Sequence, residues 1–129
     1  MSVPKQSDQS FEEINQLIWQ HLEARDWQGN PARGLAISLV LEASELLEHY
    51  QWHEDSVGGK DEVGEELADV FIYAFQLAQT LNVDIAEAIK KKLIKAGKKY
   101  PAEAFKGKSG ADRTAAWINA KKHYKKEGL

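Results

Sequence analysis

The chain has 129 residues, of which 43% are hydrophobic and 29% are charged, a balance that is ordinary for one soluble globular domain. The absence of cysteine excludes disulfides, thiolate metal sites and cysteine nucleophiles, and it favours a reducing compartment. The N-terminal stretch MSVPKQSDQS lacks the apolar core of a secretory signal. The most apolar window, residues 35–47, is too short to span a bilayer. We therefore expect a cytoplasmic protein with no membrane partner.

The net charge of −3 conceals an asymmetry along the chain. Residues 1–89 contain four Lys or Arg against seventeen Asp or Glu, whereas residues 90–129 contain thirteen against three. A basic C-terminal third of this kind is compatible with a nucleic-acid-binding tail, with lysines that bind phosphate beside a cation site, or with a solvated helix face. The charge pattern alone leaves these three interpretations open.

Helical patterns cover almost the whole chain. The first predicted helix, over 11–26, begins with a capping box formed by Ser10 and Glu13 and continues with an apolar stripe. A connector that contains proline and glycine leads to a second helix over 33–52, and a polar loop with two glycines leads to a third over 60–81.

The C-terminal part continues the helical pattern. Asp84 and Glu87 form a second cap signal, which opens a fourth helix over 85–99 that Pro101 closes. A fifth, poorly patterned helix is expected over 112–126. No strand alternation and no internal repeat is visible in the sequence.

Four helices with short links predict an all-α protein built as an antiparallel four-helix bundle, with no sheet. We expect this bundle to occupy residues 1–107. A basic, helical C-terminal extension is expected over residues 108–129.

Two pairs of acidic residues with three-residue spacing lie on consecutive predicted helices. They are Glu42 and Glu45 on the second helix and Glu66 and Asp69 on the third. At about 100° per residue, each pair borders the apolar arc of its helix and has apolar residues again on its other side. A solvent-facing acidic ridge is not framed in this way, whereas Glu65 falls further round and is expected to face water. If the two helices pack through their apolar arcs, the four carboxylates converge.

A converged carboxylate cluster repels itself unless a positive charge neutralises it. No lysine or arginine lies in either acidic stripe, so a bound cation is the economical answer. Ligands that are all oxygen favour Mg²⁺ or Mn²⁺ over Zn²⁺. A di-iron bundle needs Glu-x-x-His pairs, which the chain lacks. A solvated acidic surface ridge is the alternative.

The spacing ExxE, twenty further residues and then ExxD resembles the signature of the all-α NTP pyrophosphatases, the MazG-like superfamily. The likeness is closest to the dCTP pyrophosphatase branch. It extends between residues 25 and 101, through the stretches RDW, EASELLEHYQW, EELADVFIYAFQLA, VDIAEAI and KKYP.

The resemblance implies an enzyme that hydrolyses a nucleoside triphosphate between its α and β phosphates, releasing the monophosphate and pyrophosphate. A role in cleansing the nucleotide pool, with dCTP or related dNTPs favoured, and a homodimer or homotetramer are implied with it. The implied catalytic carboxylates, which are also the Mg²⁺ ligands, are Glu42, Glu45, Glu66 and Asp69. The implied substrate-binding residues are Trp27, Trp52, Tyr73, Lys92 and Lys95. Both tryptophans have an alternative role as ordinary core or interface residues.

Two positions depart from the family pattern and bear on base specificity. Ala96 stands where relatives often carry an asparagine, and Ile18 stands where the dCTP branch places a base-contacting histidine. They keep open a non-catalytic nucleotide or metal sensor on the same fold. A helical adaptor with a nucleic-acid-binding basic tail is a second alternative, although we expect no nucleic-acid partner for the enzyme. The segment 108–129 is expected to cover the site or a neighbouring subunit.

Overall fold

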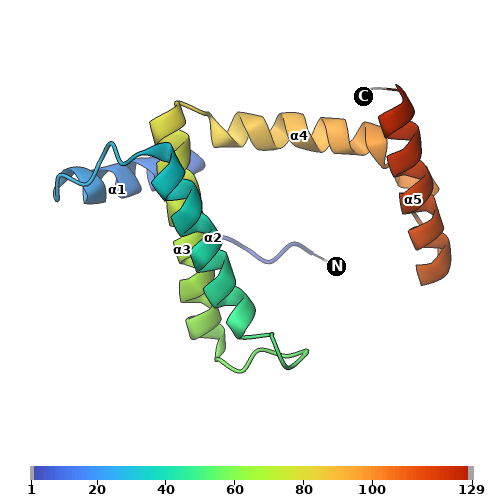
Figure 1. Ribbon diagram of the computed structural model, residues 1–129, viewed down its shortest axis with the longest axis horizontal. Coiled ribbons are helices and arrows are strands. Elements are labelled where there is room, and N and C mark those ends of the chain that lie inside the picture. Colours follow the sequence, from blue (N-terminus) through green and yellow to red (C-terminus); the bar gives the residue numbers. More distant parts are fainter. Residues whose placement is uncertain (1, 128–129) are drawn as a thin grey trace. The chain divides into compact units, whose positions relative to one another are not determined.

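The computed structural model describes residues 2–127, and the side chains of residues 2–125. The described helices are α1 (Phe11–Glu23), α2 (Ala32–Glu48), α3 (Lys60–Leu81), α4 (Ile85–Lys99), the 3₁₀-helix η1 (Ala102–Ala104) and α5 (Gly110–Glu127) (Figure 1). No strand occurs among these residues, so the predicted all-α class is confirmed. The chain forms two compact units, Met1–Ile85 and Ala86–Leu129. The expected boundary after residue 107 stays a prediction.

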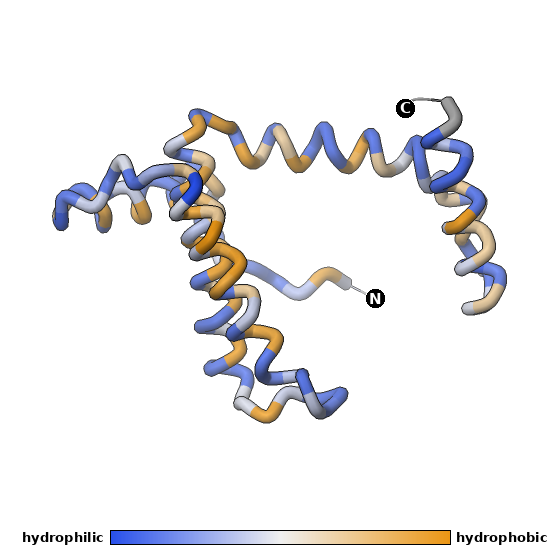
Figure 2. Tube along the Cα trace, viewed as in Figure 1, coloured by the Kyte–Doolittle hydropathy of each residue, from blue (hydrophilic) through white to orange (hydrophobic). Residues whose placement is uncertain are grey.

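The centre of the first unit is an antiparallel hairpin of α2 and α3, which lie side by side (Figure 1). Hydrophobic residues are present along both helices (Figure 2). The buried hydrophobic side chains of the described residues are Leu22, Leu35, Phe75 and Ala78. This core therefore joins α1 to the hairpin at the end where α3 finishes.

Helix α1 begins as the capping box predicts and packs on α3. The Glu13 N–H donates to the Ser10 hydroxyl at 3.2 Å, which satisfies one of the orphan amides of the first turn. The Phe11 and Phe75 rings lie 5.6 Å apart. Farther along, the Gln79 amide donates to the Asn15 carbonyl at 3.1 Å and to its side-chain oxygen at 2.8 Å. These contacts fix α1 across the second half of α3.

The predicted end of the first helix at residue 26 was wrong by three residues, because the chain makes a Schellman turn there. Asp26 adopts a left-handed backbone conformation with φ of 53°. The Trp27 N–H then donates to the Leu22 carbonyl at 2.9 Å, and the Asp26 N–H donates to the Glu23 carbonyl at 3.2 Å. The turn ends α1 and places Trp27 at the start of the loop that follows.

Helix α2 ends at Glu48, four residues before its predicted end. The His49 and Tyr50 N–H groups donate to carbonyls three residues earlier, which tightens the last turn. The loop then folds back, and the Val57 N–H donates to the His49 carbonyl at 2.9 Å. The helical wheel therefore does not apply to Trp52, which lies in the loop and is 82% exposed.

In the second unit, lysines of α4 lie over an aromatic side chain of α5. The Lys99 ammonium is 4.5 Å from the Tyr124 ring centroid, and that of Lys95 is 5.9 Å from it. The Tyr100 ring meets Phe105 edge to face at 5.9 Å. Cation–π contacts thus hold part of the basic segment together. In the part of the chain that the structure describes, no helix is long and apolar enough to cross a membrane.

Candidate functional site

Three carboxylates meet where α2 faces α3. Glu42 and Glu45 from α2 and Glu66 from α3 each offer an oxygen within 4.8 Å of the others. The three-residue spacing places the first two on one side of α2, as helical geometry requires. The structure thus brings together three of the four predicted carboxylates. Asp69, one turn after Glu66, lies outside this group but close enough for its charge to act on Glu42 and Glu66.

The electrostatics of the cluster show a shortage of positive charge. The pKa of Glu42 is raised above its ordinary value, first because burial disfavours the charged form and then because of the neighbouring Glu45 and Asp69. The pKa of Glu66 is also raised, by burial and by the hydrogen bond and charge of Glu45, while His49 opposes the shift. Each carboxylate therefore makes the ionised state of the next one less favourable.

His49 is a neighbour of this cluster that the sequence interpretation did not count as a site residue. Its Nε2 lies 3.8 Å from Glu66 Oε1, and its side chain is 13% exposed. Gly58 lies against the ring: a Cβ at this position would come within 2.5 Å of two imidazole atoms. The returning loop therefore holds the imidazole beside Glu66. The signal in the sequence was the position of His49 at the border of the acidic stripe. The sequence did not show that α2 ends at Glu48 and that the following loop returns to His49.

The residues fit a hard divalent cation. Glu66 Oε2 is buried and has no hydrogen-bond partner among the described residues. Buried polar atoms normally have such a partner, so an orphaned carboxylate oxygen beside two more carboxylates indicates a missing positive group. The donors are all oxygens, which suits Mg²⁺ or Mn²⁺. Glu65, the neighbour of Glu66, is exposed and takes no part.

A cavity of about 430 Å³ lies beside the cluster, between α1, the following loop and α3. Its lining residues are Leu17, Ile18, His21, Leu22, Trp27, Asn30, Asp69, Ile72, Tyr73 and Gln76. The cavity is therefore lined by one predicted carboxylate, Asp69, and by two predicted substrate-binding aromatics, Trp27 and Tyr73. It is also lined by Ile18, one of the two positions that depart from the family pattern. The His21 ring meets Trp27 edge to face at 6.1 Å, and the Arg25 guanidinium lies 5.8 Å from the Trp27 ring centroid.

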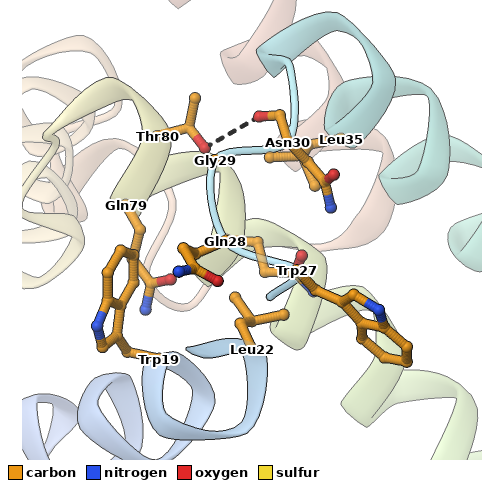
Figure 3. A pocket seen from close by; sticks show the side chains of 10 residues that line it. Trp19, Leu22, Trp27, Gln28, Gly29, Asn30, Leu35, Gln79 and Thr80 are labelled. Carbon is orange, nitrogen blue, oxygen red and sulfur yellow. Dashed lines mark hydrogen bonds between the residues drawn. The ribbon is translucent and has the colours of Figure 1, made fainter. Parts of the chain in front are cut away.

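A second, smaller cavity of about 160 Å³ is lined by the loop after α1 and the end of α3 (Figure 3). The Thr80 hydroxyl donates to the Asn30 carbonyl at 3.3 Å, the dashed line in Figure 3, and joins the loop to α3. Trp27 and Gln76 line both cavities. The loop that carries Trp27 is thereby anchored to α3.

The other predicted substrate-binding residues do not lie at these cavities. Trp52 lines neither of them. Lys92 and Lys95 are exposed residues of α4 and belong to the second unit. Their roles stay predictions.

An all-α protein that gathers carboxylates between two antiparallel helices, beside a cavity with aromatic walls, is the class that these features define. Residues 37–111, more than half of the chain, match the MazG-like family, and the chain belongs to this family. The resemblance predicted from the sequence is confirmed.

Known relatives agree with this assignment. Mouse dCTP pyrophosphatase 1 is 33% identical over 107 residues, which cover 76% of this chain and 63% of the mouse protein. Human dCTP pyrophosphatase 1 is 33% identical over 109 residues, with 78% and 64% covered. A pyrophosphatase of known structure from Archaeoglobus fulgidus is 30% identical, with a TM-score of 0.61, and the match covers 77% of this chain and 99% of that one. The chain thus spans less than two thirds of the mammalian relatives' length.

Proposed function

We propose that this protein is a nucleoside triphosphate pyrophosphohydrolase that depends on Mg²⁺ or Mn²⁺. Water would add across the anhydride between the α and β phosphates, one P–O bond forming as the bridging P–O bond breaks, to give the monophosphate and pyrophosphate. The observation that carries the proposal is the orphaned Glu66 oxygen within a three-carboxylate cluster that adjoins an aromatic cavity.

The carboxylates would bind the cation, and their negative charges would surround it. A divalent ion bound by Glu42, Glu45 and Glu66, with Asp69 beside them, would neutralise the triphosphate and acidify a bound water. A carboxylate of the cluster would accept the proton of the attacking water. Glu45 contributes to the raised pKa values of both Glu42 and Glu66, so it couples the two sides of the cluster.

The substrate assignment rests on the cavity and on the relatives. Trp27 and Tyr73 line the space beside Asp69, where the base and sugar of a nucleotide would lie. We propose dCTP or a related dNTP as the preferred substrate, since two relatives are dCTP pyrophosphatases. Trp52, Lys92 and Lys95 are proposed as further substrate contacts.

A homodimer or homotetramer is proposed as the working form. Large apolar side chains of the hairpin are exposed to solvent, among them Val40 at 65%, Leu47 at 62% and Phe71 at 53% exposure. Such a surface is typical of one that another subunit covers.

One assay tests the proposal: pyrophosphate release from the common dNTPs and NTPs, with Mg²⁺ and with a chelator. We expect Mg²⁺-dependent release from at least one triphosphate, lost in Glu66→Gln and kept in the matched variant Glu65→Gln. Release that survives Glu66→Gln would place the site elsewhere. Metal-dependent nucleotide binding without release from any triphosphate would instead identify a sensor.

A further inference from the structure

Gln76 is a neutral polar residue in an unusual position. Its side chain is only 8% exposed, the buried polar residue among the otherwise hydrophobic core of the described chain. It follows Asp69 by two helical turns and Tyr73 by one, so the three share one side of α3. All three line the 430 Å³ cavity.

The carboxamide of Gln76 has no hydrogen-bond partner in the described part of the chain. The residue as a whole is buried, but its amide atoms are not among the fully buried polar atoms that lack a partner, so they remain accessible from the cavity that Gln76 lines. Gln79, one turn later, is held to α1 because its nitrogen donates twice to Asn15, while its own Oε1 is buried without a partner. The structure therefore contains a glutamine that joins two helices and, one turn before it, a glutamine that lines the cavity and makes no such contact.

The surroundings of Gln76 suit a flat ring with polar edges. Trp27 and Tyr73 supply aromatic walls, and Ile18 and Ile72 supply apolar ones. The cavity lies in the size range of small-molecule sites, which combine apolar walls with a few polar groups. A nucleobase stacks on aromatic side chains and presents adjacent donors and acceptors, which a carboxamide matches.

Resting on the proposed function, we propose that Gln76 is a specificity-determining residue that hydrogen-bonds the base of the bound nucleotide. Its amide offers one acceptor and two donors, so it pairs with the polar edge of the base while the cluster acts on the phosphates. Base selection is thereby assigned to Gln76, two turns after Asp69 on α3, and hydrolysis to the carboxylates of α2 and α3.

Replacing the amide by a carboxylate gives a directional test. An ionised Gln76→Glu side chain presents only acceptors, which match the amino group of cytosine and repel the carbonyl of uracil at the same ring position. We expect the ratio of kcat/KM for dCTP over dUTP to rise by about tenfold, the effect of roughly one hydrogen bond. Gln76→Met keeps the shape without the polar group and is expected to bring the ratio toward one.

Gln79→Glu and Gln79→Met are the matched controls, one turn away on the same helix. They are expected to lower the melting temperature, because the Asn15 contacts are lost, and to leave the dCTP/dUTP ratio as in the wild type. Mn²⁺ affinity, measured by electron paramagnetic resonance, should stay unchanged in both Gln76 variants, which shows that the fold and the cluster are intact.

The outcomes separate this inference from the proposed function. If the wild type hydrolyses triphosphates but neither Gln76 variant changes the base ratio, Gln76 does not read the base. A changed mass of the oligomer in Gln76→Glu, with an unchanged dCTP/dUTP ratio, would show that a second copy covers this residue instead. This result would also overturn the inference. If the wild type hydrolyses nothing, the same ratio is measured for nucleotide binding by calorimetry, where the same directions are expected.

Discussion

The carboxylate cluster and the cavity next to it differ in the kind of polar group that each presents. In the cluster, charged groups raise one another's pKa, and the buried Glu66 oxygen has no partner. In the cavity, the polar group is the neutral amide of Gln76, set among aromatic and apolar walls. The negative charge of the cluster would be neutralised by a cation, and such a site would act on any nucleoside triphosphate. A neutral amide pairs with a matching polar edge of a ligand, which is the role in base selection that we propose for Gln76.

Glu45→Gln should have the largest effect, because it removes a carboxylate of the cluster whose charge acts on both Glu42 and Glu66. We expect kcat to fall by roughly a thousandfold, as for loss of a group that stabilises transition-state charge. The preference among bases should not change, since the cavity is intact. Steady-state kinetics on dCTP and dUTP check both parts. A variant that loses base preference and retains kcat would reverse the two assigned roles.

Trp27→Ala should affect the cavity and spare the cluster. Losing a stacked aromatic costs about 1–3 kcal/mol per base, so we expect KM to rise by about tenfold or more. Mn²⁺ affinity should stay as in the wild type. The control is Trp19→Ala: Trp19 lines the smaller cavity and donates to Glu23 at 3.1 Å, and its loss should leave KM nearly unchanged. Equal effects of the two substitutions would contradict a base site in the larger cavity.

The metal-free protein should lose stability as the pH rises. Glu42 and Glu66 have raised pKa values in the folded state, so folding favours their protonated forms. Their contribution is complete below the ordinary value of 4.5 and is lost as the pH rises through the raised values. The melting temperature of chelator-treated protein should therefore fall more steeply with pH in the wild type than in Glu42→Gln. Glu65→Gln should keep the wild-type slope, and identical slopes in all three proteins would contradict the coupling.

Gly58→Ala should have the smallest effect and tests whether the loop positions His49. The added Cβ would come within 2.5 Å of the imidazole and 2.9 Å of a Glu62 oxygen, so the ring and the loop cannot both keep their positions beside Glu66. Displacing an outer neighbour of a ligand should weaken Mn²⁺ binding by roughly tenfold. Gly59→Ala is the control, since its Cβ would meet nothing within 4 Å. Equal affinities in the two variants would show that the His49 position does not matter.

The cluster was largely predictable from the sequence because its cause is local. The spacing of Glu42 and Glu45, and of Glu66 and Asp69, fixes which residues share a helix side, and the bounds of α3 agree with the predicted 60–81. Two helices with acidic borders then bring the carboxylates together when they pack. The metal-binding role itself stays a proposal.

The cavity was less predictable because its causes are not local. Trp27 is positioned by a left-handed Asp26, a conformation that no glycine announces in the sequence. Gln76 looks like any polar residue on a long helix, and its burial depends on how the other elements of the unit pack against α3. The early end of α2 likewise depends on the loop that returns to His49, so the helical wheel assigned Trp52 to a helix that had already ended.

The most direct test of the central claim is a Mn²⁺ titration, followed by electron paramagnetic resonance, of the wild type, Glu66→Gln and Glu65→Gln. If the cluster is a metal site, the wild type and Glu65→Gln bind Mn²⁺ with the same affinity, Mg²⁺ competes, and Glu66→Gln binds at least about tenfold more weakly. Equal affinity in all three proteins would contradict the account, because the ion would then bind somewhere other than the cluster.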